Sequence, residues 1–180
     1  KNRAPPLFCI QLMNRALKNR LLIYLCLFMG LIIDSYNFSS NFQFIKPSFV
    51  LLILIYWNMA LPDKVGITTA LLFGVLIDLL HSSLLGLHGL LFVLITYFCQ
   101  RFFYQFRITP IWQQSFLIFI LAIIVKQILA FDFLDSEVTR SNLSDNYYFV
   151  NTFYYAILSS LSWAPVYYLC RLYRRRWIKT

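Results

Sequence analysis

Runs of apolar residues separated by short polar breaks dominate the chain. A membrane-crossing helix needs about 20 mostly apolar residues, and six runs approach or reach that length. They cover residues 21–33, 48–61, 65–80, from the break at 81–86 to about 99, about 111–131 and about 147–170. The pattern therefore predicts an all-α, polytopic integral membrane protein with six transmembrane helices.

The second and third runs are short for membrane spans. Their 14 and 16 residues correspond to roughly 21 and 24 Å of helix. Core helices or a re-entrant pair would fit these lengths as well. The tight turn Pro62-Asp63-Lys64 between them favours an antiparallel hairpin, in which local bilayer thinning absorbs the mismatch.

Composition excludes other classes of protein. Of the 180 residues, 60% are hydrophobic and 13% are charged, against about 45–50% and about 25% in an average soluble domain. Intrinsic disorder is excluded because it requires low hydrophobicity. Six helices use roughly 120 residues, so no separate soluble or catalytic domain is expected.

Three segments follow from this pattern. Residues 1–20 form a basic cytoplasmic segment, of which 1–12 are assigned no structure and are open to being a tag or an altered start. A signal peptide would need small residues at its cleavage site, whereas Asp34-Ser35-Tyr36 follows the first run, so this run is interpreted as an uncleaved helix. Residues 21–170 form one membrane domain, and residues 171–180 a basic cytoplasmic tail.

The basic residues indicate the orientation. The chain carries 16 Lys and Arg and a net charge of +9. With both termini in the cytoplasm, thirteen of them lie inside and only Lys46 and Arg140 outside, while Lys126 falls within a span. The acidic stretch 132–145 then lies on the far side. This asymmetry is what the positive-inside rule predicts, and it requires an even number of spans.

The basic tail at 171–179, with Tyr173 and Trp177 interleaved, has two interpretations. Such a cluster can bind nucleic acid. Beside a final membrane helix it more often binds anionic lipid headgroups, and this second interpretation is preferred.

The residue types that carry catalysis or bind metals form no recognisable pattern. His81 and His88 lack a third ligand at a spacing suited to a metal, and no Gly-rich phosphate loop or nucleophile elbow occurs. Four scattered cysteines are best explained as small apolar residues: Cys9, Cys26, Cys99 and Cys170. No catalytic residue, cofactor or metal is therefore expected.

Ionisable residues inside apolar runs are costly and are candidate functional sites. Asp34, Asp78 and Lys126 fall at similar depths toward the outer face in the six-span topology, with His81 and His88 nearby. We expect Lys126 to pair with Asp78, or as second choice with Asp34. The cluster could serve as a structural ion pair, a partner-facing patch or part of a solute or proton path; the last would usually accompany internal repeats, and none is evident.

Several motifs occur in order along residues 46–115. KPSFVLLILIYW (46–57) is followed by ALP (60–62), GVLIDLL (74–80), SLLG (83–86) and WQQ (112–114). This ordered set resembles the bacterial rod shape-determining protein MreD family. The remainder of the chain is similar in hydropathy alone.

The resemblance implies a non-catalytic inner-membrane component of the cell-elongation (rod shape) complex, which helps to organise peptidoglycan synthesis. Implied partners are MreC, the MreB complex, and the SEDS glycosyltransferase RodA with its class B transpeptidase. The implied fold is similar to the membrane S component of ECF transporters, so the alternative function is solute binding or transport. Six residues are carried over by matching position: Pro47, Trp57, Pro62, Gly74, Asp78 and Gly86.

Each carried-over residue also has an ordinary structural explanation. The two prolines bound a helix, Trp57 could anchor the chain at a membrane interface, and Gly74 permits close helix packing. Asp78 is the strongest candidate for function, because apart from Lys126 no partner in the sequence explains its burial.

Overall fold

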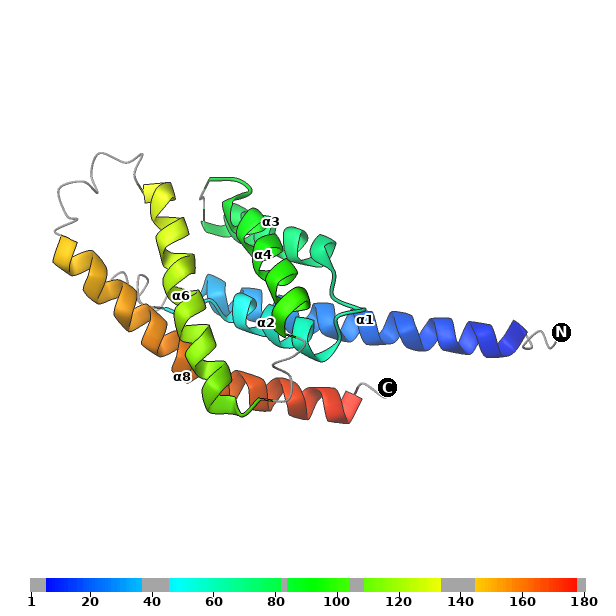
Figure 1. Cartoon of the computed structure of the whole chain (residues 1–180). Coiled ribbons are helices and arrows are strands. Elements are labelled where there is room, and N and C mark those ends of the chain that lie inside the picture. Colours follow the sequence, from blue (N-terminus) through cyan, green and yellow to red (C-terminus); the bar gives the residue numbers. More distant parts are fainter. Residues whose placement is uncertain (1–5, 37–45, 82–83, 104–108, 134–144, 178–180) are drawn as a thin grey trace.

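The computed structural model describes residues 6–36, 46–81, 84–103, 109–133 and 145–177. Within these ranges the chain is entirely helical, with six α-helices, one π-helical segment and no strand (Figure 1). The elements are α1 (Pro6–Ser35), α2 (Phe49–Ala60), α3 (Ile67–His81), α4 (Leu87–Phe98), the π-helix η1 (Cys99–Phe103), α6 (Ile111–Phe133) and α8 (Asp145–Trp177).

The predicted all-α class is confirmed, and each of the six apolar runs forms one helix. The differences lie at the helix ends. Residues 1–12 were assigned no structure, yet α1 begins at Pro6, where a proline loses no hydrogen bond. The basic tail is helical as far as Trp177, because Arg174, Arg175 and Arg176 in the last turn complement the negative end of the helix dipole.

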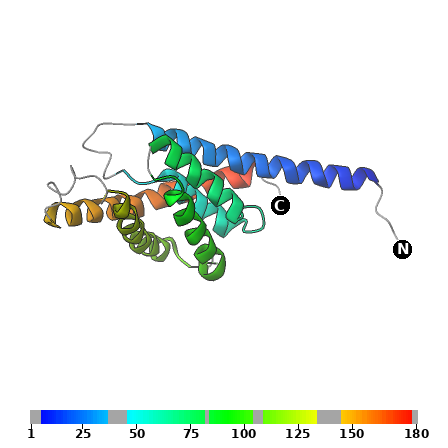
Figure 2. The ribbon, with the colours of Figure 1, turned by 90° about the horizontal axis from the view of Figure 1, so that it is seen from above.

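Helix α2 lies at the centre of the molecule. Every residue from Val50 to Ala60 is buried, and α1, α4, η1 and α8 all contact this helix. The two views of Figures 1 and 2 agree that α2 (cyan) lies among the other helices. A helix that is apolar on all sides is typical of a protein core or of a membrane span, and the apolar run at 48–61 forms the core helix of this molecule.

The other helices pack in pairs around α2. Consecutive helices α3 and α4 form a hairpin, and α6 packs against α8. In both views the N-terminal half of α1 extends beyond the other helices, and the C-terminal end of α8 points toward the same side (Figures 1 and 2). The Tyr173 hydroxyl of α8 donates a hydrogen bond to the Leu22 carbonyl of α1 at 3.3 Å, which joins the first and last helices near their basic ends.

One helix in the described part of the chain is long and apolar enough to cross a membrane by length and composition, over Ile111–Leu129. Helices α2 and α3 and the stretch Leu87–Phe102 are apolar but shorter. Large hydrophobic side chains are exposed along α1, α3, α4, α6 and α8. The exterior of the helix bundle is therefore apolar.

Candidate functional site

Asp78 lies near the closed end of the α3–α4 hairpin. It lies in the last turns of α3, is 1% exposed, and receives backbone N–H groups from the start of α4. Its Oδ2 accepts the amide of Gly86 at 2.8 Å and that of Gly89 at 3.4 Å, and its Oδ1 accepts the amide of His88 at 3.1 Å. The first amides of a helix lack partners within the helix, so Asp78 caps α4 from the preceding helix.

His88 adds a side-chain contact to the same carboxylate. Its Nδ1 lies 2.6 Å from Asp78 Oδ1, where an ionised carboxylate requires the imidazole to donate its Nδ1–H. The ring packs edge-on to Phe92, with centroids 6.5 Å apart. The His88 side chain is 17% exposed. The pair therefore lies at the edge of the protein interior.

Two glycines bring α3 and α4 into backbone contact next to this carboxylate. A Cβ on Gly74 would lie 2.5 Å from the Cα of Gly89 and 2.7 Å from the carbonyl oxygen of His88. Such distances are below any van der Waals contact, so the crossing of the two helices requires a residue without a side chain at position 74. The carboxylate of Asp78, one helical turn further along α3, then reaches the amides of α4.

Gly86 shapes the turn that precedes α4. Its φ of +98° lies in the left-handed region, which glycine adopts without the steric cost that a side chain adds. Its N–H is one of the donors to Asp78. Gly74, Asp78 and Gly86 thus contribute to a single structure, the closed α3–α4 hairpin.

Asp34 has the same capping role in the preceding pair of helices, α1 and α2. It lies near the end of α1 and is 7% exposed. Its carboxylate accepts the amides of Phe49 at 2.9 Å and Val50 at 3.0 Å, and the Ser48 hydroxyl at 3.2 Å. An acidic residue at the end of one helix therefore caps the start of the next in both hairpins.

Lys46 complements Asp34 by covering the opposite helix end. Its ammonium donates to the carbonyls of Ile33 at 2.6 Å, Asp34 at 2.9 Å and Tyr36 at 2.9 Å. Ile33 and Asp34 lie in the last turn of α1 and Tyr36 directly follows it, where helix carbonyls lack partners within the helix. His81, at the end of α3, lies within electrostatic range of Asp34, Lys46, Asp78 and His88. The ends of α1 and α3 thus form one polar cluster.

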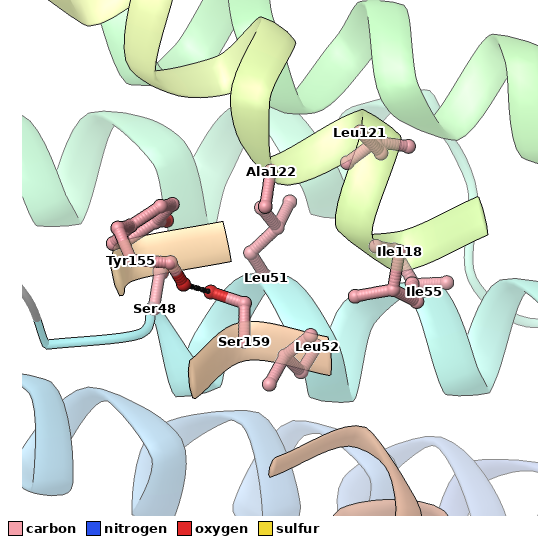
Figure 3. Close-up of a pocket in the computed structure, with 9 residues that line it drawn as sticks. All are labelled: Ser48, Leu51, Leu52, Ile55, Ile118, Leu121, Ala122, Tyr155 and Ser159. Carbon is pink, nitrogen blue, oxygen red and sulfur yellow. Dashed lines mark hydrogen bonds between the residues drawn. The ribbon is translucent and has the colours of Figure 1, made fainter. Parts of the chain in front are cut away.

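A small cavity lies beside this cluster, between α2, α6 and α8 (Figure 3). Its polar lining comes from Ser48, Tyr155 and Ser159, and the Ser159 hydroxyl donates to the Tyr155 carbonyl at 2.7 Å. The volume is about 10 Å³. That space accommodates about one water molecule, which gives no support to the binding of a solute.

Comparison with known proteins agrees with the motifs on this hairpin. A family model described as rod shape-determining protein MreD matches residues 17–173. The chain belongs to the MreD family. It is 30% identical over 136 residues to the rod shape-determining protein MreD of Haemophilus influenzae, an alignment that covers 76% of this chain and 80% of that protein.

No solved structure matches the chain. The similarity of fold to the membrane S component of ECF transporters, which the MreD resemblance implied, therefore has no support from a known structure.

The remaining motif residues of the MreD resemblance lie along the central helix. Pro47 is buried just before α2, and Pro62 follows its end. Trp57 is fully buried within α2 and packs edge-on to Tyr56 and Tyr173, with centroids 5.4 and 6.5 Å apart. Trp57 therefore packs in the core, whereas a residue that anchors the chain at a membrane interface would be exposed.

The predicted pair of Asp78 and Lys126 stays a prediction, as does the second choice with Asp34. In the structure His88 is an ionisable partner of the Asp78 carboxylate. The Lys126 ammonium lies 4.8 Å from the centroid of the Tyr155 ring on α8, a distance at which a cation is attracted to the face of an aromatic ring.

The sequence placed His88 near Asp78 but assigned it no contact with the carboxylate, and it did not single out Gly89. The distance of ten residues between Asp78 and His88, across a turn that contains Gly86, was the available signal. The acidic stretch with Asp135 and Glu137 lies outside the described residues, so its location on the far side of the membrane stays a prediction.

The sequence also did not single out a second cluster of buried and half-buried polar side chains. The Asn58 side chain of α2 donates to the Thr96 hydroxyl of α4 at 3.2 Å, and Gln100 in η1 donates to the Val65 carbonyl at 3.0 Å. Gln100 also donates to the Asn58 oxygen at 3.4 Å. These bonds fix the π-helical turn to the α2–α3 connection.

Proposed function

We propose that this MreD family member maintains rod shape as a multi-pass inner-membrane component of the cell-elongation complex that binds partners and does not catalyse a reaction. The observation that carries the proposal is the family match over residues 17–173. The contacts of Asp78 support the part of the proposal that assigns no catalysis, since its carboxylate already binds three amides and the His88 imidazole. We assign Asp78 and His88 a structural role, which is to hold helices α3 and α4 together.

Membrane placement is supported by the exterior of the molecule. Leu72 on α3, Phe116 on α6 and Leu161 on α8 are 65%, 62% and 71% exposed, an arrangement that favours lipid over water as the surrounding solvent. We propose that all six helices are embedded in the bilayer and that both termini are cytoplasmic. The Tyr173–Leu22 contact between the basic ends of α8 and α1 supports placing the termini on one side.

We propose that the partners are MreC, the MreB complex, and RodA with its class B transpeptidase. Exposed apolar helices of this kind associate within a bilayer through packing and a few polar groups. The basic ends, with Arg171 and Arg174–Arg176 on α8, suit anionic lipid headgroups.

Depletion and rescue test the proposal. A rod-shaped bacterium depleted of its own MreD is expected to become round and to regain rod shape when this chain is expressed. Cells that stay round, although the protein is present in the membrane fraction, would contradict the shape-determining role in that host.

Co-purification from native membranes tests the partners separately. Recovery of MreC and the cell-wall synthases is expected. Recovery of a bound small molecule or an ATPase module in their place would contradict the assembly role and favour transport.

A further inference from the structure

The lengths of helices α3 and α4 carry the inference. Helix α3 contains 15 residues, and α4 with its π-helical continuation η1 contains 17, which correspond to about 22 and 25 Å at 1.5 Å per residue. The hydrocarbon core of a bilayer is about 30 Å thick. In contrast, α6 has 23 residues, enough for about 34 Å. The two arms of the α3–α4 hairpin are therefore about 8 and 5 Å too short to reach both surfaces of a bilayer.

The two ends of this hairpin differ in chemistry. At the base, where α3 begins and α4 ends, Asp63 and Arg101 are exposed and Lys64 is half-buried. At the opposite end, which we call the tip, leucines are exposed: Leu79 (61%), Leu80 (54%), Leu84 (54%), Leu85 (72%) and Leu90 (60%). Charged residues are stable in water and leucines in hydrocarbon. We therefore place the base of the hairpin at the side of the membrane that faces water.

Five backbone amides in the described part of the tip, those of residues 86–90, bind partners within the protein. Asp78 accepts the amides of Gly86, His88 and Gly89. The amide of Leu87 donates to the Leu84 carbonyl at 3.1 Å, and that of Leu90 to the Gly86 carbonyl at 2.7 Å. In water these groups could bind solvent. In hydrocarbon each unsatisfied group costs several kcal/mol, so internal partners become a requirement.

The neighbouring end of α1 follows the same rule. Lys46 binds two carbonyls of its last turn and the carbonyl of Tyr36 just beyond it, and Asp34 binds the first amides of α2. His81 at the end of α3 lies within electrostatic range of Asp34, Lys46 and Asp78. Asp34, Lys46 and Asp78 thus bind partners within the protein, whereas His81 is exposed among the leucines of the tip.

We infer that the tip of the α3–α4 hairpin lies below the membrane surface, with Leu84 and Leu85 in contact with lipid acyl chains. The Asp78 carboxylate is then the group that allows a helix turn to exist at that depth. A hairpin that enters and leaves by the same surface does not change the side on which any other segment lies. The inference rests on the proposed membrane placement.

Spin-label accessibility tests the depth of the tip directly. Leu85→Cys is labelled with a nitroxide in a background whose native cysteines are replaced by alanine, and the protein is reconstituted into phosphatidylcholine–phosphatidylglycerol vesicles. Collisions are measured with oxygen, which concentrates in hydrocarbon, and with a water-soluble nickel chelate. Asp63→Cys at the base serves as the water control, and Ile120→Cys, 44% exposed in mid-α6, as the lipid control.

A label at position 85 is expected to behave like the label at position 120, with high oxygen and low nickel accessibility. High nickel accessibility would overturn the inference, because the tip would then be in water. Low accessibility to both reagents would also overturn it, because a protein would then cover the tip. A water-accessible label at position 120 would instead contradict the membrane placement itself.

A second measurement covers the case in which the cysteine-free protein does not fold. Benzoylphenylalanine is placed at position 85 in the otherwise unchanged chain and irradiated in native membranes. A phospholipid adduct is expected, whereas a protein adduct alone, or none, would contradict lipid contact.

Discussion

At the scale of single residues, two buried carboxylates have the same structural role. Asp34 and Asp78 each lie near the end of one helix and bind the first amides of the next. A carboxylate suits this position because the free amides and the helix dipole both favour negative charge there. Each acid thereby joins two helices that follow one another along the chain.

Replacing Asp78 by asparagine should weaken the fold. The amide oxygen can accept one N–H, but the amide nitrogen would meet further N–H donors of α4. Hydrogen bonds to charged groups contribute about 1.5–3 kcal/mol each, so Asp78→Asn is expected to lower the free energy of unfolding by about 2 kcal/mol. Unfolding in detergent mixtures, followed by circular dichroism, measures this.

The matched control for this substitution is Asp63→Asn. Asp63 is exposed in the α2–α3 turn, and surface substitutions usually change stability by less than about 0.5 kcal/mol. Equal losses for the two variants would contradict the capping role of Asp78.

Double-mutant cycles test the partners of Asp78. His88 contacts the carboxylate at 2.6 Å, so Asp78→Asn with His88→Asn should destabilise less than the sum of the single changes, with a coupling of about 1 kcal/mol. Unfolding of the four proteins in detergent measures the coupling. An additive result would remove His88 from the site.

The same cycle with Lys126→Met tests the pair predicted from sequence. If Lys126 and Asp78 form a pair, the double variant should recover much of the stability that Lys126→Met loses. Purely additive losses would contradict that pairing.

The sequence could single out Asp78, but it could not supply its partners. A charge within an apolar run, together with a family motif, identified the residue. The partners are backbone amides of α4 and the His88 ring, and these become neighbours only when the helices cross. Backbone amides occur at every position except proline, so no residue pattern identifies which of them bind.

At the scale of elements, the closed hairpin of α3 and α4 depends on the contact between Gly74 and Gly89. The apolar runs located both helices but carried no information on how closely they approach. It also failed to show that α2 would be central, although a run without a polar face is consistent with burial on all sides. The termini of α1 and α8 were missed because basic residues were assigned to tails, and these residues are helical.

Gly74→Ala should disrupt this hairpin. The added Cβ would lie 2.5 Å from the Cα of Gly89, so the two backbones must separate, and overpacking of this kind costs about 1–3 kcal/mol. Thermal unfolding in detergent is the measurement.

Gly30→Ala on α1 is the matched control. There the closest atom to the added Cβ is the end of the Ile53 side chain at 2.9 Å, and a side chain can rotate away. A loss for Gly30→Ala as large as that for Gly74→Ala would contradict the backbone-contact explanation.

At the scale of the whole molecule, three features support the same placement in the membrane. The helices surround a fully buried α2, the exterior is apolar, and the basic ends of α1 and α8 are joined by the Tyr173–Leu22 hydrogen bond. Partner binding and the depth of the hairpin tip both depend on a chain that is embedded in the bilayer with its ends on one side.

Reporter fusions at the two ends of the chain test that placement most directly. Green fluorescent protein fused to either end is expected to fluoresce, because it folds in the cytoplasm, and alkaline phosphatase at the same positions is expected to stay inactive. Active phosphatase at either end would contradict the account, as would a fusion protein that stays in solution without detergent.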